Sequence, residues 1–252
     1  MAETITEIKK KLEAAQREQR MELMEQYRAD SRAGVQKVIQ KYEKEEEKYR
    51  QELLRTEQMK EFEYKYKEYP YICGIDEVGR GPLAGPVVAG AVILPKDENI
   101  LYLNDSKQLS AKKREELYDV ILEKAVGVGI GVVSPAEIDR VNILQATYEA
   151  MRIAIQNLPV KPDLLLNDAV TIPKVDIKQV GIVKGDARSV SIAAASIVAK
   201  VTRDRMMVEY DQTYPAYHFA SNKGYGSKEH IDALRQVGPC EIHRKTFITK
   251  FV

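Results

Sequence analysis

Two kinds of hydrophobic pattern follow one another along the chain and change near residue 70. Before it, apolar residues recur at three- and four-residue spacing, as in Ile5, Ile8 and Leu12, which predicts amphipathic helices. After it, short apolar runs rich in β-branched residues alternate with longer amphipathic segments. This second pattern predicts strands and helices that follow one another in an α/β domain.

The second region contains five predicted strands and three long predicted helices. The strands are expected at residues 71–75, 86–94, 127–133, 163–168 and 179–183. The helices are expected at residues 110–126, 142–157 and 189–214. Ser134 to Glu137 adds a capping box with proline at the first helical position. Only a short turn separates the first two strands, so we expect them to pair antiparallel in a mixed sheet.

Charge divides the chain at the same place. Residues 1–70 hold 16 Lys or Arg and 16 Asp or Glu, one glycine, and a single proline at position 70. This composition predicts a charged helical extension over residues 1–70, broken near 29–34 into two helices, and a globular domain over 71–252. The extension is either a solvated helical pair or a docking arm for an unknown protein partner or nucleic acid. Its balanced charge favours the solvated pair.

Overall composition excludes several classes of protein. The 252 residues carry 39 basic and 38 acidic side chains, so binding to nucleic acid by bulk charge alone is excluded, although a local basic groove is not. No apolar run reaches the length of a membrane span, and the first residues lack a signal-peptide pattern. Cys73 and Cys240 are too few for a disulfide framework or a cysteine-based zinc site. We therefore expect a cytoplasmic protein without a membrane partner, and a monomer.

Four carboxylates, called the four acids below, each end an apolar run: Asp76, Glu77, Asp168 and Asp186. A half-buried carboxylate without a partner is costly, so four of them at one sheet edge require cations. Oxygen ligands without His or Cys favour a hard ion such as Mg²⁺ or Mn²⁺, and two such ions can assist hydrolysis of a phosphodiester. The alternative is that the aspartates are turn formers or helix caps, as Asp186 after a glycine suggests.

The segment GIDEVGRGPLAGPVVA, residues 74–89, resembles the N-terminal signature of the type 2 ribonucleases H, the family of bacterial ribonuclease HII. Six more segments resemble the family's motifs in the same order. They lie at residues 104–109, 162–169, 184–186, 191–205, 223–225 and 242–247. The resemblance covers residues 71–252 and is specific because all seven segments are collinear.

This resemblance implies a ribonuclease H fold, with a mixed five-stranded sheet flanked by helices and its first three strands antiparallel. It implies that the four acids are catalytic and hold Mn²⁺ or Mg²⁺. The family cleaves the RNA strand of RNA–DNA hybrids and nicks duplex DNA 5′ to an embedded ribonucleotide, leaving 3′-hydroxyl and 5′-phosphate ends. A role in removing ribonucleotides from DNA follows from that activity.

The resemblance also implies substrate contacts. Gly79, Arg80 and Gly81 match a family motif that contacts the 2′-hydroxyl at the RNA-to-DNA junction, although a simple glycine-rich hairpin turn would have the same sequence. Tyr225 matches a tyrosine that stacks on the following deoxyribose, and its alternative is a packed loop anchor. Further candidates for contacts to the nucleic-acid backbone, each with a solvated surface position as its alternative, are Lys107, Lys200 and Arg203.

Two rival hypotheses use the same fold. Ribonuclease HIII shares the acids, but its usual β-rich N-terminal domain does not match the helical extension, and Arg80 is present here. A non-catalytic adaptor has no reason to keep four acids that need metal. One departure from the family is Asn222, where members commonly have His before the Lys-Gly-Tyr segment. The sequence leaves open the metal, the preferred substrate and the roles of the three histidines at 218, 230 and 243.

Overall fold

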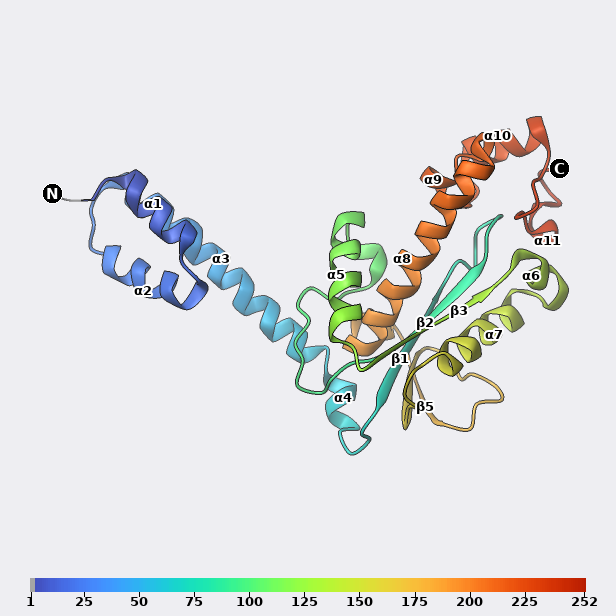
Figure 1. Cartoon of the computed structure of the whole chain (residues 1–252), viewed down its shortest axis with the longest axis horizontal. Coiled ribbons are helices and arrows are strands. Elements are labelled where there is room, and N and C mark those ends of the chain that lie inside the picture. The colour runs from blue at the N-terminus through green and yellow to red at the C-terminus, as the bar shows by residue number, and fades with distance from the viewer. Residues whose placement is uncertain (1–2) are drawn as a thin grey trace. The chain divides into compact units, whose positions relative to one another are not determined.

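The computed structural model describes residues 3–252, which form two compact units with the boundary along the chain between Arg55 and Thr56 (Figure 1). The first unit contains helices α1 (Ile5–Ala14), α2 (Arg17–Tyr27) and most of α3 (Ala33–Gln58). Its core holds the apolar positions that the helical spacing predicts, among them Ile8, Leu12, Val35 and Ile39. No helix within residues 3–252 is both long and apolar enough to cross a membrane.

The break that the sequence predicts near residues 29–34 is present between α2 and α3, but the region contains more helices than the two expected. Ala15 and Gln16 adopt extended backbone and separate α1 from α2 without a glycine or proline. A short helix, α4 (Glu61–Lys65), follows α3 and belongs to the second unit. It does so because Phe62 packs against Ile72 and Ile192 of that unit.

The second unit is built on a five-stranded mixed sheet, as predicted. Its strands are β1 (Ile72–Val78), β2 (Val87–Ile93), β3 (Gly127–Val133), β4 (Leu164–Asp168) and β5 (Lys178–Ile182), in the spatial order β3-β2-β1-β4-β5. β1 and β2 pair antiparallel, as do β2 and β3, whereas β4 runs parallel to both β1 and β5. The expected antiparallel pairing of the first two strands is confirmed.

Helices cover both faces of this sheet. They are α5 (Ala111–Lys124), α6 (Pro135–Val141), α7 (Ile143–Gln156), α8 (Val190–Thr213), α9 (Phe219–Asn222), α10 (Lys228–Val237) and α11 (Lys245–Ile248). In Figure 1, α8 in orange and α7 in yellow-green lie on opposite sides of the strands. Small residues of α7, such as Ala150 and Ala154, pack on one face of the sheet, and Ala193 to Ala195 of α8 belong to the core on the other.

The contact between α8 and the sheet is backbone against backbone. A Cβ atom at Gly74 of β1 would lie 2.0 Å from the carbonyl carbon of Ser191, and one at Gly90 of β2 would lie 2.5 Å from the carbonyl oxygen of Ala195. Because no side chain fits at either position, helix and strands approach more closely than in ordinary packing. This contact places the first turn of α8 against the amino-terminal half of β1, and it places Ser196, in the second turn of the helix, beside Asp76 near the carboxyl end of the strand.

Candidate active site

The four acids lie at one edge of the sheet. Asp76 and Glu77 belong to the last three residues of β1, and Asp168 is the last residue of the neighbouring parallel strand β4. Asp186 follows β5 in a 3₁₀ turn, Gly185–Ala187, and the backbone N–H of Gly185 donates to Asp168 Oδ1 at 2.8 Å. Parallel strands end at the same edge, so the topology itself gathers these carboxylates.

Burial and the mutual repulsion of the carboxylates raise the pKa values of three of the four acids. Burial and then the charge of Glu77 raise the pKa of Asp76 to about 8, and a hydrogen bond with Ser196 of α8 opposes that rise only in part. Burial also raises the pKa of Glu77, and the guanidinium of Arg80 at 3.2 Å works against it. The pKa of Asp186 is raised by burial and by the charges of Asp105 and Asp168. The acids therefore form one electrostatic cluster.

Asp105 is an acid of this cluster that the sequence analysis did not name. It caps the 3₁₀ turn Ser106–Gln108 by accepting from the backbone N–H of Lys107 at 2.9 Å. From there its charge raises the pKa of Asp186, whereas the ammonium of Lys107 lowers it. The sequence does contain a signal for Asp105, because this residue lies in the segment 104–109 that resembles a motif of the family. Lys107 is exposed at the same edge.

The donor set suits a hard divalent cation. All the acids offer carboxylate oxygen, and like charges held together in a partly buried site are relieved by a cation between them. Within residues 3–252, no group of three or more His, Cys, Asp or Glu side chains forms a ready-made metal cage. Asp168 and Asp186 are only half-buried at the rim, so their side chains have room to move onto an ion.

The glycine-arginine-glycine turn, residues 79–81, lies beside the acids because it directly follows β1. Gly79 has a φ of +91°, which a side chain rarely tolerates, and a Cβ there would lie 2.3 Å from Nε of Arg203. Gly81 faces open space. The Arg80 side chain is 47% exposed, and its guanidinium bonds to Glu77 at 3.2 Å. The turn therefore places an exposed guanidinium in contact with one of the four acids.

Tyr225 lies in a loop, residues 223–226, that is hydrogen-bonded to the same part of the chain. The carbonyl of Gly224 accepts from the backbone N–H groups of Leu83 and Ala84, at 2.8 and 3.3 Å. The Tyr225 side chain is 44% exposed, so it is not a buried loop anchor. The structure therefore holds the tyrosine loop against the segment that continues from the glycine-arginine-glycine turn.

Sequence reasoning missed the two groups that support this loop from behind. Arg203, offered above as a contact to nucleic acid, is fully buried and donates to backbone carbonyls instead. His230 and His243 are also buried, and their Nε2 atoms lie 2.9 Å apart. Nδ1 of His230 bonds to the carbonyl of Tyr225 at 2.8 Å. The sequence could not indicate this pair, because only the folding of α10 and the C-terminal segment brings the two rings together.

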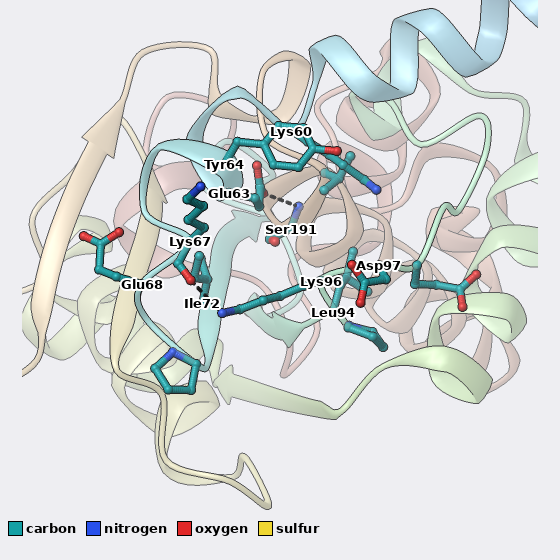
Figure 2. A pocket seen from close by; sticks show the side chains of 14 residues that line it. Lys60, Glu63, Tyr64, Lys67, Glu68, Ile72, Leu94, Lys96, Asp97 and Ser191 are labelled. Carbon is teal, nitrogen blue, oxygen red and sulfur yellow. Dashed lines mark hydrogen bonds between the residues drawn. The ribbon is translucent and has the colours of Figure 1, made fainter.

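A cavity of about 570 Å³ lies away from the acids, beside Ile72 at the opposite end of β1 (Figure 2). Apolar side chains such as Leu94 form much of its wall. Glu63 borders it and caps α8, accepting from Ser189 Oγ at 2.6 Å and from the Ser191 N–H at 3.1 Å. Its other carboxylate oxygen is buried without a hydrogen-bond partner within residues 3–252. The cavity holds none of the four acids, so we do not assign the chemistry to it.

Comparison with known proteins gives matches along the whole chain. A family described as Ribonuclease HII matches residues 73–250, and one described as Ribonuclease HII N-terminal domain matches residues 4–67. The curated ribonuclease HII of Lachnoclostridium phytofermentans is 64% identical over 97% of this chain and 96% of its own length. That of Clostridioides difficile is 52% identical over 97% of each chain.

Solved structures show the same likeness for the second unit. The ribonuclease H2 of Pyrococcus horikoshii OT3 superposes with a TM-score of 0.59 and 30% identity, covering 70% of this chain and 93% of that one. The chain in the structure of the PCNA:RNase HII complex from Archaeoglobus fulgidus gives a TM-score of 0.59 at 26% identity, covering 71% and 94%.

Proposed function

The chain belongs to the ribonuclease HII family, and on that premise we propose that it is an endonuclease that cuts ribonucleotides paired to DNA, using the four acids. Ribonuclease HII activity is a phosphodiester hydrolysis, class EC 3.1.26.4, and divalent metal dependence is typical of the family. We propose Mn²⁺ or Mg²⁺ as the ion. The substrates are RNA–DNA hybrids and duplex DNA with embedded ribonucleotides, nicked on the 5′ side to leave 3′-hydroxyl and 5′-phosphate ends.

The observation that carries this proposal is the electrostatic coupling of the four acids at one sheet edge. Three of them have raised pKa values, for which burial and neighbouring carboxylates are the causes that raise them. A fold keeps such a costly cluster when cations and a phosphate group are its partners. The adaptor hypothesis gives no physical reason for it.

The four acids would hold the divalent ions, which when bound supply positive charge for the attacking water and the leaving oxygen of a phosphodiester. The other roles fall to the chain itself. Asp105 adds negative charge beside Asp186 and so strengthens the hold on a cation there. Arg80 neutralises Glu77 until substrate arrives and is exposed enough to turn toward a phosphate. Tyr225 presents an exposed ring on which a sugar can stack.

The substrate contacts stay proposals of the same kind. Gly79, Arg80 and Gly81 would contact the 2′-hydroxyl, the group that distinguishes ribose from deoxyribose. Lys107 would contact the nucleic-acid backbone from the neighbouring 3₁₀ turn, where its side chain is exposed. We also propose residues 71–252 as the catalytic domain and residues 1–70 as a helical extension. The two family matches, which end at residue 67 and begin at residue 73, support that division.

The test is cleavage of a labelled DNA duplex that carries one ribonucleotide, with Mn²⁺, Mg²⁺ or EDTA, by the wild-type chain and Asp76→Asn. Asp176→Asn, at an exposed position between β4 and β5, is the matched control. We expect a metal-dependent nick 5′ to the ribonucleotide, lost in Asp76→Asn and kept in the control. Cleavage of long hybrids alone would refute the junction contacts. Full activity of Asp76→Asn, or activity in EDTA, would refute the metal site.

A further inference from the structure

Two fully buried arginines lie behind the substrate loops. Arg244, just before α11, donates from Nη2 to the carbonyl of Gly79 at 2.5 Å and from Nη1 to the carbonyl of Arg80 at 3.0 Å. It also donates to the carbonyl of Gly85, from Nε at 3.0 Å and from Nη2 at 2.8 Å. Its guanidinium therefore binds both ends of the loop that contains the glycine-arginine-glycine turn.

Arg203 of α8 binds the same loop and the next one. Its Nε donates to the carbonyl of Pro86 at 2.9 Å and its Nη2 to that of Ala84 at 3.1 Å. Its Nη1 donates to the carbonyl of Lys223 at 2.9 Å, in the loop that carries Tyr225. One side chain thus connects both segments that we propose as substrate contacts.

Neither arginine has the partner that a buried charge normally requires. Within residues 3–252, no carboxylate lies within salt-bridge distance of Arg203 or Arg244, and Arg244 binds backbone carbonyls and packs against the ring of Phe247. Desolvation lowers the pKa of Arg244 to about 9, and the charge of Arg203 contributes. Two positive charges buried side by side cost stability, so packing alone does not account for them.

The geometry of the peptide bond shows what these bonds do to the loop. In a trans peptide, the carbonyl of one residue and the N–H of the next point in opposite directions. Holding the carbonyls of Gly79 and Arg80 inward therefore turns the N–H groups of Arg80 and Gly81 outward. In the described part of the chain those two N–H groups donate to no acceptor, and both residues are exposed. Successive outward N–H groups form an anion-binding concavity.

We propose that Arg203 and Arg244 are positioning residues that hold the carbonyls inward, so that the N–H groups of Arg80 and Gly81 face the substrate at the ribonucleotide. Their unpaired charges, set directly behind those N–H groups, also attract the adjoining phosphate. The inference rests on the proposed function, because it assigns a cause to the contact proposed for residues 79–81.

The proposal predicts a change in substrate preference rather than a uniform loss. A single embedded ribonucleotide offers one 2′-hydroxyl in one register, so a loosened loop loses its contact. A long hybrid offers a 2′-hydroxyl at every position of one strand, so a loosened loop still finds one. Lysine keeps the charge but has one ammonium group and cannot bind several carbonyls at fixed angles as a guanidinium does.

The experiment compares Arg244→Lys and Arg203→Lys with the wild-type chain on both substrates, measuring kcat, KM and the Mn²⁺ concentration for half-maximal activity. Arg152→Lys is the control, since Arg152 also donates to a backbone carbonyl, that of Pro173, on a segment outside the proposed site. We expect kcat/KM on the single-ribonucleotide duplex to fall about tenfold, mostly through KM, with a much smaller loss on the hybrid. The Mn²⁺ dependence should not move, and Arg152→Lys should keep the wild-type ratio.

Gly81→Pro supplies a test that leaves both arginines in place, because proline has no N–H to present. Gly81→Ala is its comparison, and the proline variant should discriminate against the single-ribonucleotide duplex about tenfold more than the alanine variant. Equal losses on both substrates in the arginine variants, or equal behaviour of Gly81→Pro and Gly81→Ala, would overturn the inference. Failure of the proposed function would be seen earlier, as a wild-type chain that does not nick the duplex.

Discussion

Replacing Asp76 by asparagine should make the metal-free protein more stable while abolishing its activity. Asp76 is 8% exposed, and its pKa of about 8 in the folded chain lies far above the ordinary value of 3.8. A raised pKa means that the folded chain binds the proton more tightly than the unfolded chain does. The stabilisation that comes from the protonated Asp76 is therefore complete below about pH 4 and is lost as the pH rises to about 8. Asparagine carries no charge at any pH and avoids this loss.

The size of the effect follows from the pKa shift. A pKa shift of one unit corresponds to 1.36 kcal/mol, so a rise of about four units sets an upper limit of about 5.5 kcal/mol above pH 8. Side chains and water rearrange around a charged carboxylate, which reduces the penalty, and we expect about 3 kcal/mol. For a domain of this size that difference corresponds to a rise in Tm of roughly 6–12 °C.

The assay is thermal unfolding in EDTA between pH 5 and pH 9, followed by circular dichroism. The Tm of Asp76→Asn should exceed that of the wild-type chain by an amount that grows up to pH 8 and then levels off. Saturating Mn²⁺ should raise the wild-type Tm and narrow the gap, because the cation neutralises the acids in the folded state alone. Asp176→Asn should follow the wild type throughout. Equal Tm values for Asp76→Asn and wild type at pH 8 in EDTA would refute the charge strain inferred for Asp76.

Three further predictions concern stability. Gly79→Ala should lower the free energy of unfolding by about 1–3 kcal/mol, because Gly79 has a φ of +91° and a Cβ there would meet Arg203. Gly81→Ala should leave the urea midpoint unchanged, and equal midpoints for the two variants would contradict this prediction. Burial and then the charge of His230 lower the pKa of His243 to about 4. As the pH falls, His243 is therefore protonated in the unfolded chain before it is protonated in the folded chain, and the free energy of unfolding decreases between pH 6.5 and pH 4. His243→Asn should flatten that part of the Tm-against-pH curve, and an unchanged slope would count against it. Glu63→Ala removes a cap of α8 and should lower the free energy of unfolding in urea by about 1–2 kcal/mol. Glu63→Gln should lower it less, because glutamine keeps an oxygen that can accept the same hydrogen bonds.

The sequence predicts the sheet well because its strands are apolar runs bounded by turns. All five strands and the antiparallel start were expected, and the observed limits differ by a few residues. β1 extends to Val78 rather than ending at residue 75, because Asp76 and Glu77 continue the ladder opposite Gly90 and Ala89 despite their charge. Hydrophobic pattern does not report that continuation, since backbone hydrogen bonds determine it.

The residues that support the site are less visible in the sequence. Arg203 lies in a helical segment where an arginine is ordinarily exposed, and only the tertiary structure shows its burial. Arg244 is 158–165 residues away from the carbonyls that its side chain binds. Such contacts depend on the folded arrangement of distant segments, and no local pattern encodes them. The acids, in contrast, were expected because each ends an apolar run, and the parallel strands β1, β4 and β5 then bring those ends together in the fold.

The direct backbone contact between α8 and the sheet limits how this protein can change. A larger residue at Gly74 or Gly90 meets main-chain atoms, which cannot move aside as a side chain does. Substitutions are therefore tolerated more easily in the loops and on the outer surfaces than at these two glycines. A chimaera between relatives should exchange β1, β2 and α8 as one block, because a mismatch where α8 packs on Gly74 and Gly90 would displace Ser196 from Asp76. New substrate preferences are most accessible through the exposed side chains of the loops around Arg80 and Tyr225, which lie outside this contact.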